Sequence, residues 1–338
     1  MTRERRVKKG NKQDGKSFRI SSASHPSSLI PRPLSSVSHS SSLIPRSSRT
    51  KTTAVFFPFD LFGSGGAGAG AQLLADAFQE MLADNRREKV ATRARAYAGK
   101  VRFQEFTFET MDDYRDWRSQ ARKVIRQALE RGDFLLWIAG NHLGVLPLYE
   151  ELTSRERKRP EESVVVQFDA HLDIYNLADC TKELSHGNFL LHADGPLPGL
   201  INVGHRELLL RPEYVSKYYR QTFSAADLAV NPEPALAAVR EAAGRAGRVF
   251  LDLDCDVFDP AYFPGMAHPL PFGISPQLFL RFLDAAWSDN VAGLAISEFE
   301  PNRDQNDRSL ATLIWLIEYV LLRRYECGER GSAGARER

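Results

Sequence analysis

Residues Val164–Asp173 read VVVQFDAHLD, an apolar run that ends in two carboxylates and an imidazole. The run from Val164 to Phe168 has the length and composition of a buried strand. Strands that are apolar on both faces are typical of parallel sheets covered by helices on both sides. In such sheets ligands bind at the carboxyl ends of the strands, where Asp169, His171 and Asp173 lie. This stretch therefore predicts an α/β fold and the place of its chemistry.

Strand-sized apolar runs alternate with helical patterns along the chain from about residue 53. Strands are predicted at residues 54–59, 100–108, 134–138, 164–168, 200–203, 248–253 and 291–297. Helices are predicted at residues 72–83, 111–131, 143–152, 234–243, 275–287 and 309–323. The glycine-rich stretch 63–70 is predicted to be a flexible loop. This alternation predicts a three-layer α-β-α domain with a central, mostly parallel sheet.

The overall composition is ordinary for a soluble globular protein, with 43% hydrophobic and 26% charged residues in a chain of 338. No stretch approaches the roughly 20 apolar residues that a membrane-spanning helix needs, so no membrane association is expected. The three cysteines, Cys180, Cys255 and Cys327, are too few for a disulfide framework and fit a reducing compartment. We therefore expect a cytoplasmic protein.

The basic charge of the chain is concentrated in residues 1–50, which hold eleven lysines and arginines but only two acids. The rest of the chain is mildly acidic, so the sequence does not indicate a nucleic-acid partner. Residues 1–50 are rich in serine and poor in aromatics, and we expect them to be disordered. Their composition resembles that of an organelle transit peptide. A start site assigned too far upstream would also account for them, and the sequence leaves both possibilities open. A single catalytic domain is expected at 51–326, followed by a flexible tail at 327–338.

Three further predicted strands also end in chemically active side chains. His142 follows strand 134–138, Asp254 and Asp256 end strand 248–253, and Glu298 follows strand 291–297. Taken singly, each residue has a plainer interpretation as a turn, cap or loop residue. Taken together, they place two imidazoles and several carboxylates at one edge of one sheet, which favours a common site.

The spacing of these residues is suited to metal binding. Alternate residues of an extended backbone point the same way, so Asp169, His171 and Asp173 can converge, as can Asp254 and Asp256. Crowded carboxylates repel one another unless cations neutralise them. Oxygen ligands with one imidazole per ion suit Mn²⁺. Two such ions can bridge a water molecule and lower its pKa, which gives hydroxide as the nucleophile.

Three motifs carry a resemblance to a known family. They are Ala139-Gly140-Asn141-His142, then Asp169–Asp173, and then Asp252–Pro260, which reads DLDCDVFDP. Their order and residue types resemble those of the ureohydrolases, the arginase–agmatinase family, from about Val55 to Arg323. The resemblance implies an arginase-like fold and hydrolysis of a C–N bond in a linear amidine. The small-molecule substrate is expected to be a guanidino compound such as agmatine, arginine or a related guanidino acid.

The resemblance also implies individual roles and two Mn²⁺ per chain. One ion is expected to be held by His142, Asp169, Asp173 and Asp254. The other is expected to be held by Asp169, His171, Asp254 and Asp256. His186 corresponds to the family's active-site histidine that shuttles protons or orients substrate, Glu298 to the glutamate that pairs with the guanidinium, and Asp173 is expected to relay the nucleophile's proton. Family members are commonly trimers or hexamers, so a homo-oligomer is implied.

Several positions depart from the family's pattern. Asn141 stands where the family usually has Asp, and Asp252 stands where it usually has Ser. The loop between Asp173 and His186 differs from that of arginases, and its residues Tyr175 and Lys182, with Asn188 beyond it, are the predicted substrate contacts. The sequence therefore does not predict specificity for L-arginine.

Two alternatives stay open. A deacetylase-like amidohydrolase with one zinc ion shares the fold, but it needs adjacent histidines, which the sequence lacks. A substrate-divergent or non-catalytic relative fits the altered loop. The full set of metal-ligand residues argues against a non-catalytic relative, because unpaired acids are costly to keep in a cleft without function.

Overall fold

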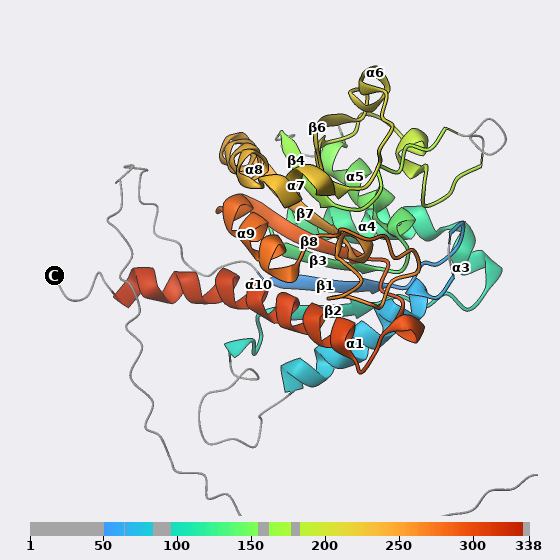
Figure 1. The fold of residues 1–338 in the computed structure, drawn as a ribbon. Helices are drawn as coiled ribbons and strands as arrows, with labels where there is room; N and C mark the ends of the chain where they lie inside the picture. The colour runs from blue at the N-terminus through green and yellow to red at the C-terminus, as the bar shows by residue number, and fades with distance from the viewer. Residues whose placement is uncertain (1–50, 64, 84–95, 155–161, 177–182, 334–338) are drawn as a thin grey trace, which may run out of the picture. The chain divides into compact units, whose positions relative to one another are not determined.

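The computed structural model describes residues 51–63, 65–83, 96–154, 162–176 and 183–333 (Figure 1). Within them, eight strands form one sheet in which every neighbouring pair is parallel, in the order β2-β1-β3-β8-β7-β4-β5-β6. The strands are β1 (Thr52–Phe57), β2 (Val101–Glu105), β3 (Phe134–Ala139), β4 (Ser163–Phe168), β5 (Gly199–His205), β6 (Tyr219–Ser224), β7 (Arg248–Asp254) and β8 (Val291–Ser297). No helix in these ranges combines the length and apolarity needed to cross a membrane.

The central strands are apolar throughout because both of their faces are buried. Every residue of β1, β3, β4 and β5 is buried. In β4, Val164 and Val166 contribute to one hydrophobic core, whereas Val165 between them contributes to the other. Successive side chains of a strand point to opposite faces, so a strand between two cores shows no polar alternation.

Helices cover both faces of the sheet, so the predicted three-layer α-β-α fold is confirmed (Figure 1). One face is covered by α1 (Ala67–Ala83), α8 (Glu233–Arg245), α9 (Pro276–Ala286) and α10 (Arg308–Ala333). The other is covered mainly by α4 (Trp117–Glu130) and α5 (Leu146–Thr153). The shorter helices are α3 (Met111–Arg115), α6 (Pro212–Val215), α7 (Ala225–Val230), η1 (His142–Val145), η2 (Phe189–His192), η3 (Cys255–Val257) and η4 (Pro301–Arg303).

Some element boundaries differ from those predicted. The helix predicted at 111–131 is broken at Asp116, and its first part, α3, begins with a capping box between Thr110 and Asp113. Strand β6 was not predicted, because it is an edge strand of polar residues that are mostly exposed or half-buried. Helix α10 extends to Ala333, ten residues beyond the predicted end at Arg323. The predicted tail 1–50 lies outside the described residues, and the domain limits stay predictions.

The glycine-rich stretch predicted to be a flexible loop is instead partly helical, because α1 begins at Ala67. A Cβ atom at Gly70 would lie 1.9 Å from the carbonyl oxygen of Phe299, and one at Gly140 would lie 2.2 Å from that of Phe59. These glycines therefore permit close backbone contact between α1 and the segments that follow β1, β3 and β8. The consequence is a tightly packed wall beside the carboxyl ends of the central strands.

Candidate metal centre

The predicted metal ligands, together with Glu298, lie at the carboxyl ends of four strands that are neighbours in the sheet. Strands β3, β8, β7 and β4 are adjacent in that order, and all are parallel, so their carboxyl ends share one edge. The residues at this edge, strand by strand, are His142 after β3, Glu298 after β8, Asp254 and Asp256 at the end of β7, and Asp169, His171 and Asp173 after β4. The structure thus brings together all seven of these predicted residues.

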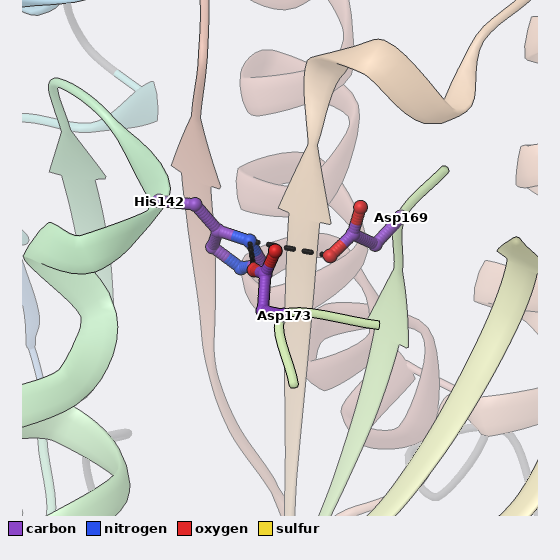
Figure 2. A group of neighbouring side chains, drawn as sticks. All are labelled: His142, Asp169 and Asp173. Atoms are coloured by element: carbon purple, nitrogen blue, oxygen red, sulfur yellow. Dashed lines mark ion pairs between the residues drawn. The ribbon is translucent and has the colours of Figure 1, made fainter. Parts of the chain in front are cut away.

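The first group of possible metal ligands surrounds the imidazole of His142 (Figure 2). The Nδ1 atom of His142 lies 2.8 Å from Oδ2 of Asp173 and 3.2 Å from Oδ2 of Asp169. It also lies 3.2 Å from Oδ2 of Asp254. All four side chains are buried. Three carboxylates from two segments of the chain therefore lie close to one ring nitrogen.

A second group, formed by Asp169, His171 and Asp256, adjoins the first. Nδ1 of His171 lies 2.9 Å from Oδ2 of Asp256 and 3.8 Å from Oδ1 of Asp169. The backbone N–H of Asp256 donates to Oδ1 of Asp254 (2.9 Å), which holds these two carboxylates together. Asp169 belongs to both groups, so two cations at this edge would share it as a ligand.

The buried atoms that face this space lack hydrogen-bond partners, which fits a cation. His142 Nδ1, Asp169 Oδ2 and Asp173 Oδ2 are buried and form no hydrogen bond within the described residues. Unpartnered buried polar atoms are costly and rare in proteins. A set of carboxylate oxygens with two imidazoles is a donor set suited to Mn²⁺ and similar divalent ions. The residues present therefore fit the metal that the sequence predicted.

The pKa values of these groups show how poorly the protein alone balances their charge. Burial and the charge of Asp173 raise the pKa of Asp169 to about 7, and burial and Asp256 hold the pKa of Asp254 well above its usual range. Burial lowers the pKa of His171, but its hydrogen bond with Asp256 and nearby acids outweigh burial and raise it to about 10. Without a cation, burial and the neighbouring acids therefore favour the protonated forms of Asp169 and Asp254.

Two residues of the site have a backbone conformation that L-residues seldom adopt. The φ angles of Asp173 and Glu298 are 50° and 61°. Left-handed backbone at residues other than glycine costs free energy and is found most often at functional sites. Glu298 directly follows β8, whereas Asp173 lies five residues after the end of β4, in the segment that supplies three side chains of the site.

A cavity of about 440 Å³ opens over this cluster. It is lined by Phe62, Gly63, His142, His171, Asp173, Tyr175, Ser185, His186, Gly187, Asn188, Asp254, Asp256, His268 and Glu298. In its wall, Nδ1 of His186 lies 3.3 Å from Oε1 of Glu298, and the backbone N–H of His142 donates to the same oxygen (2.9 Å). The hydrogen bond that His186 donates to Glu298 raises the pKa of His186, although burial opposes this effect. The two residues predicted to handle substrate and protons are therefore in contact.

The predicted substrate contacts differ in their surroundings. Tyr175 lines the cavity, and its hydroxyl donates to Glu207. Asn188 also lines it, but its Oδ1 accepts from the N–H of Ser185 (2.8 Å) and its Nδ2 donates to the carbonyl of Glu183 (2.8 Å). Its amide thus shapes its own loop. Lys182 lies outside the described residues.

Three residues of the site were not predicted to act there. Asp252 and Tyr149 lie behind His142, and His268 lies in the cavity wall with its ring centroid 5.9 Å from that of His186. Asp252 shares the strand face of Asp254 two residues later, so alternation in β7 was a signal for it. No local pattern marked Tyr149 or His268.

Comparisons with known proteins give a consistent result. A family model described as the arginase family matches residues 51–322. Agmatinase from Proteus mirabilis is 30% identical over 199 residues, which cover 58% of this chain and 61%, less than two thirds, of that enzyme. Agmatinase from Neisseria meningitidis serogroup A is 27% identical over 255 residues, which cover 74% of this chain and 79% of that one. A hypothetical agmatinase from Burkholderia thailandensis shares the fold, with a TM-score of 0.66 at 20% identity over 82% of this chain and 87% of that chain.

Proposed function

The chain belongs to the arginase family, and on that premise we propose that it hydrolyses a C–N bond of a guanidino compound at a binuclear manganese centre. The family consists of hydrolases that act on non-peptide C–N bonds of linear amidines. The observation that carries the proposal is the pair of ligand groups that share Asp169. Two groups with a common carboxylate support two ions rather than the single zinc of a deacetylase-like enzyme.

The proposed ligands are those that the sequence indicated. His142, Asp169, Asp173 and Asp254 would hold one Mn²⁺, and Asp169, His171, Asp254 and Asp256 would hold the other. The unpartnered buried atoms of His142, Asp169 and Asp173 support the first set. When bound, such cations supply Lewis acidity and activate water for attack at neutral pH.

The protein's own side chains would position the substrate and move protons. The carboxylate of Glu298 accepts N–H bonds from the planar guanidinium, and its contact with His142 N–H and His186 fixes its orientation. Water adds to the central carbon and gives up its proton to Asp173. As the C–N bond breaks, the leaving nitrogen takes a proton from His186, whose pKa is raised by its hydrogen bond with Glu298.

A substrate panel tests this proposal. The chain loaded with Mn²⁺ should release urea or another small amine or amide product from at least one of agmatine, L-arginine and related guanidino acids. Agmatine is the first compound to test, because the similar enzymes from Proteus mirabilis and Neisseria meningitidis are agmatinases. A chain that binds two ions per molecule yet releases product from no member of the panel is instead a non-catalytic or substrate-divergent relative.

We further propose a cytoplasmic location and a homo-oligomer, a trimer or hexamer. The sparse cysteines support the first, and the described Cys255 is a free, buried thiol. The family resemblance supports the second. Light scattering on the purified full chain gives the oligomer mass, and a monomer at assay concentration would refute the assembly.

A further inference from the structure

A buried carboxylate, Asp252, lies directly behind the imidazole of His142. Its Oδ2 is 3.0 Å from Nε2 of His142 and accepts a hydrogen bond from the hydroxyl of Tyr149 (2.5 Å). Both Asp252 and Tyr149 are fully buried. Asp252 therefore contacts the ring nitrogen opposite the one that faces the carboxylate cluster.

Asp252 is costly for the fold, which argues that it has a function. Its other oxygen, Oδ1, is buried and has no hydrogen-bond partner within the described residues. No described lysine or arginine pairs with it, and its only ion-pair partner there is His142. A buried carboxylate with one oxygen unpaired is destabilising unless it serves another group.

The contact fixes which nitrogen of His142 can bind a cation. A carboxylate only accepts hydrogen bonds, so Nε2 of His142 must be the donor. In the neutral imidazole, the lone pair then lies on Nδ1, the atom that faces Asp169 and Asp173. A partner on the far nitrogen orients a ligating histidine and raises its basicity.

Neighbouring rings hold this arrangement in place. Tyr149, on α5, donates to Oδ2 of Asp252, the same oxygen that His142 contacts. Phe189 lies edge-on to His142 at 5.1 Å between centroids and 6.1 Å from the ring of Tyr149. His142 therefore has little room to rotate.

The other histidine of the centre lacks this support. The side chain of His171 is 23% exposed, whereas that of His142 is 2% exposed. Among the residues that the structure describes, none forms a hydrogen bond with Nε2 of His171. The two halves of the centre thus share carboxylates, but only His142 has a carboxylate at its Nε2 atom among the described residues.

We propose that Asp252 and Tyr149 are positioning residues that hold His142 as an Nε2–H imidazole, so that the His142 half of the centre binds its divalent cation more tightly than the His171 half. This inference rests on the metal centre of the proposed function. It adds that the two cation positions differ in affinity. Residues that contact neither cation set this difference.

Competitive chelator titration of the full chain with Mn²⁺, read by metal content, tests the inference. The wild-type chain should bind in two steps of different affinity. Asp252→Asn should weaken the tighter step by about 10- to 100-fold, the usual effect of losing a residue that orients a metal ligand. The weaker step should be unchanged. Tyr149→Phe removes one hydroxyl and should weaken the tighter step several-fold.

Asp133→Asn is the matched control. Asp133 is also a buried acid, but it lies at the amino end of β3 and accepts hydrogen bonds from Thr53 and Arg131. It should lower the unfolding temperature of the metal-free chain and leave both binding steps unchanged. Asp252→Asn is distinguished from this control by its effect on metal affinity.

Several outcomes would overturn the inference. An unchanged tighter step in Asp252→Asn would refute it while leaving the metal centre intact, and so would weakening of only the weaker step. If Asp252→Asn does not fold, an unchanged tighter step in Tyr149→Phe refutes it equally. A wild-type chain that binds no Mn²⁺ overturns the metal centre, and this inference with it.

Discussion

Two groups of buried acids in this protein have opposite surroundings. On α5, Glu151 accepts hydrogen bonds from Arg122 (2.8 Å) and Arg126 (2.9 Å), and Glu150 accepts from Arg118 (3.0 Å). At the carboxyl ends of the central strands, no described lysine or arginine forms an ion pair with Asp169, Asp173, Asp254 or Asp256. The fold neutralises the first group with its own cations. It leaves the second group to be neutralised from outside.

The pKa values show the same difference. Burial raises the pKa of Glu151, but the hydrogen bonds and charges of Arg126 and Arg122 outweigh burial and lower it. Burial of Asp169 is not offset in this way, and its pKa rises to about 7. Burial has the same effect on both carboxyls, so the partner decides whether a buried acid is structural or available for a ligand.

The largest effect is expected from Asp254→Asn, which removes a carboxylate shared by both proposed metal sites. The chain should lose at least one Mn²⁺, and kcat/KM should fall by more than about 10³-fold, beyond the loss from one stabilising group. Metal analysis and urea release measure both. Unchanged metal content and activity would show that Asp254 and the aspartates clustered with it do not form a metal centre.

Replacing His186 tests whether Glu298, which contacts His186, has a different role from the clustered aspartates that we propose bind the cations. His186→Asn should lower kcat by about 10²-fold, the low end of general acid–base catalysis. The metal content should not change, because His186 contacts Glu298 and not the clustered aspartates. His192→Asn, outside the cavity lining, is the control and should keep full activity. Loss of metal in His186→Asn would contradict this division of roles.

Glu151→Gln tests the group of acids that the fold neutralises. The change removes the buried carboxylate that Arg122 and Arg126 share and should lower the free energy of unfolding by about 3 kcal/mol. Metal content and kcat should be those of the wild type. Denaturant unfolding measures the loss, and Glu241→Gln, in an exposed pair with Arg245, should change it by less than about 0.5 kcal/mol. A reduced metal content would indicate that the two groups are coupled.

The pH dependence of stability should have opposite signs for Asp169 and Glu151. In the metal-free chain Asp169 has a folded pKa of about 7, above its ordinary 3.8, so the stability it contributes is present at low pH and is lost as pH rises towards 7. Glu151 has a folded pKa below its ordinary 4.5, so its contribution is present above pH 4.5 and is lost on acidification.

Denaturant unfolding of the metal-free chain between pH 4.5 and 7 should therefore show a decline with rising pH, at most about 1.4 kcal/mol per pH unit for one proton. Excess Mn²⁺ should abolish the decline, because the cation replaces the protons. An equal decline with and without Mn²⁺ would assign the pH dependence to groups outside the metal centre.

Much of the fold was predictable because its signals are local. The apolar runs that became β3, β4, β7 and β8 were visible within a few residues, and so were the acids and imidazoles that follow them. Individual hydrogen bonds between distant segments were not predictable. Tyr149 lies 103 residues from Asp252, and neither has a pattern that indicates their hydrogen bond. The glycines near Ala67 indicated flexibility, whereas their effect is to let a helix approach Phe299 closely.

The sequence by itself determined the central strands, most of the longer helices and the donor residues of VVVQFDAHLD and its related segments, because periodicity and residue chemistry act over short distances. The tertiary structure decided that β3, β8, β7 and β4 lie side by side, although the chain visits them in another order. It also decided that Asp169, Asp173 and Asp254 converge on Nδ1 of His142, while Asp252 contacts Nε2. Strand order and burial depend on the packing of the whole chain, so only the folded molecule shows which acids lack a partner.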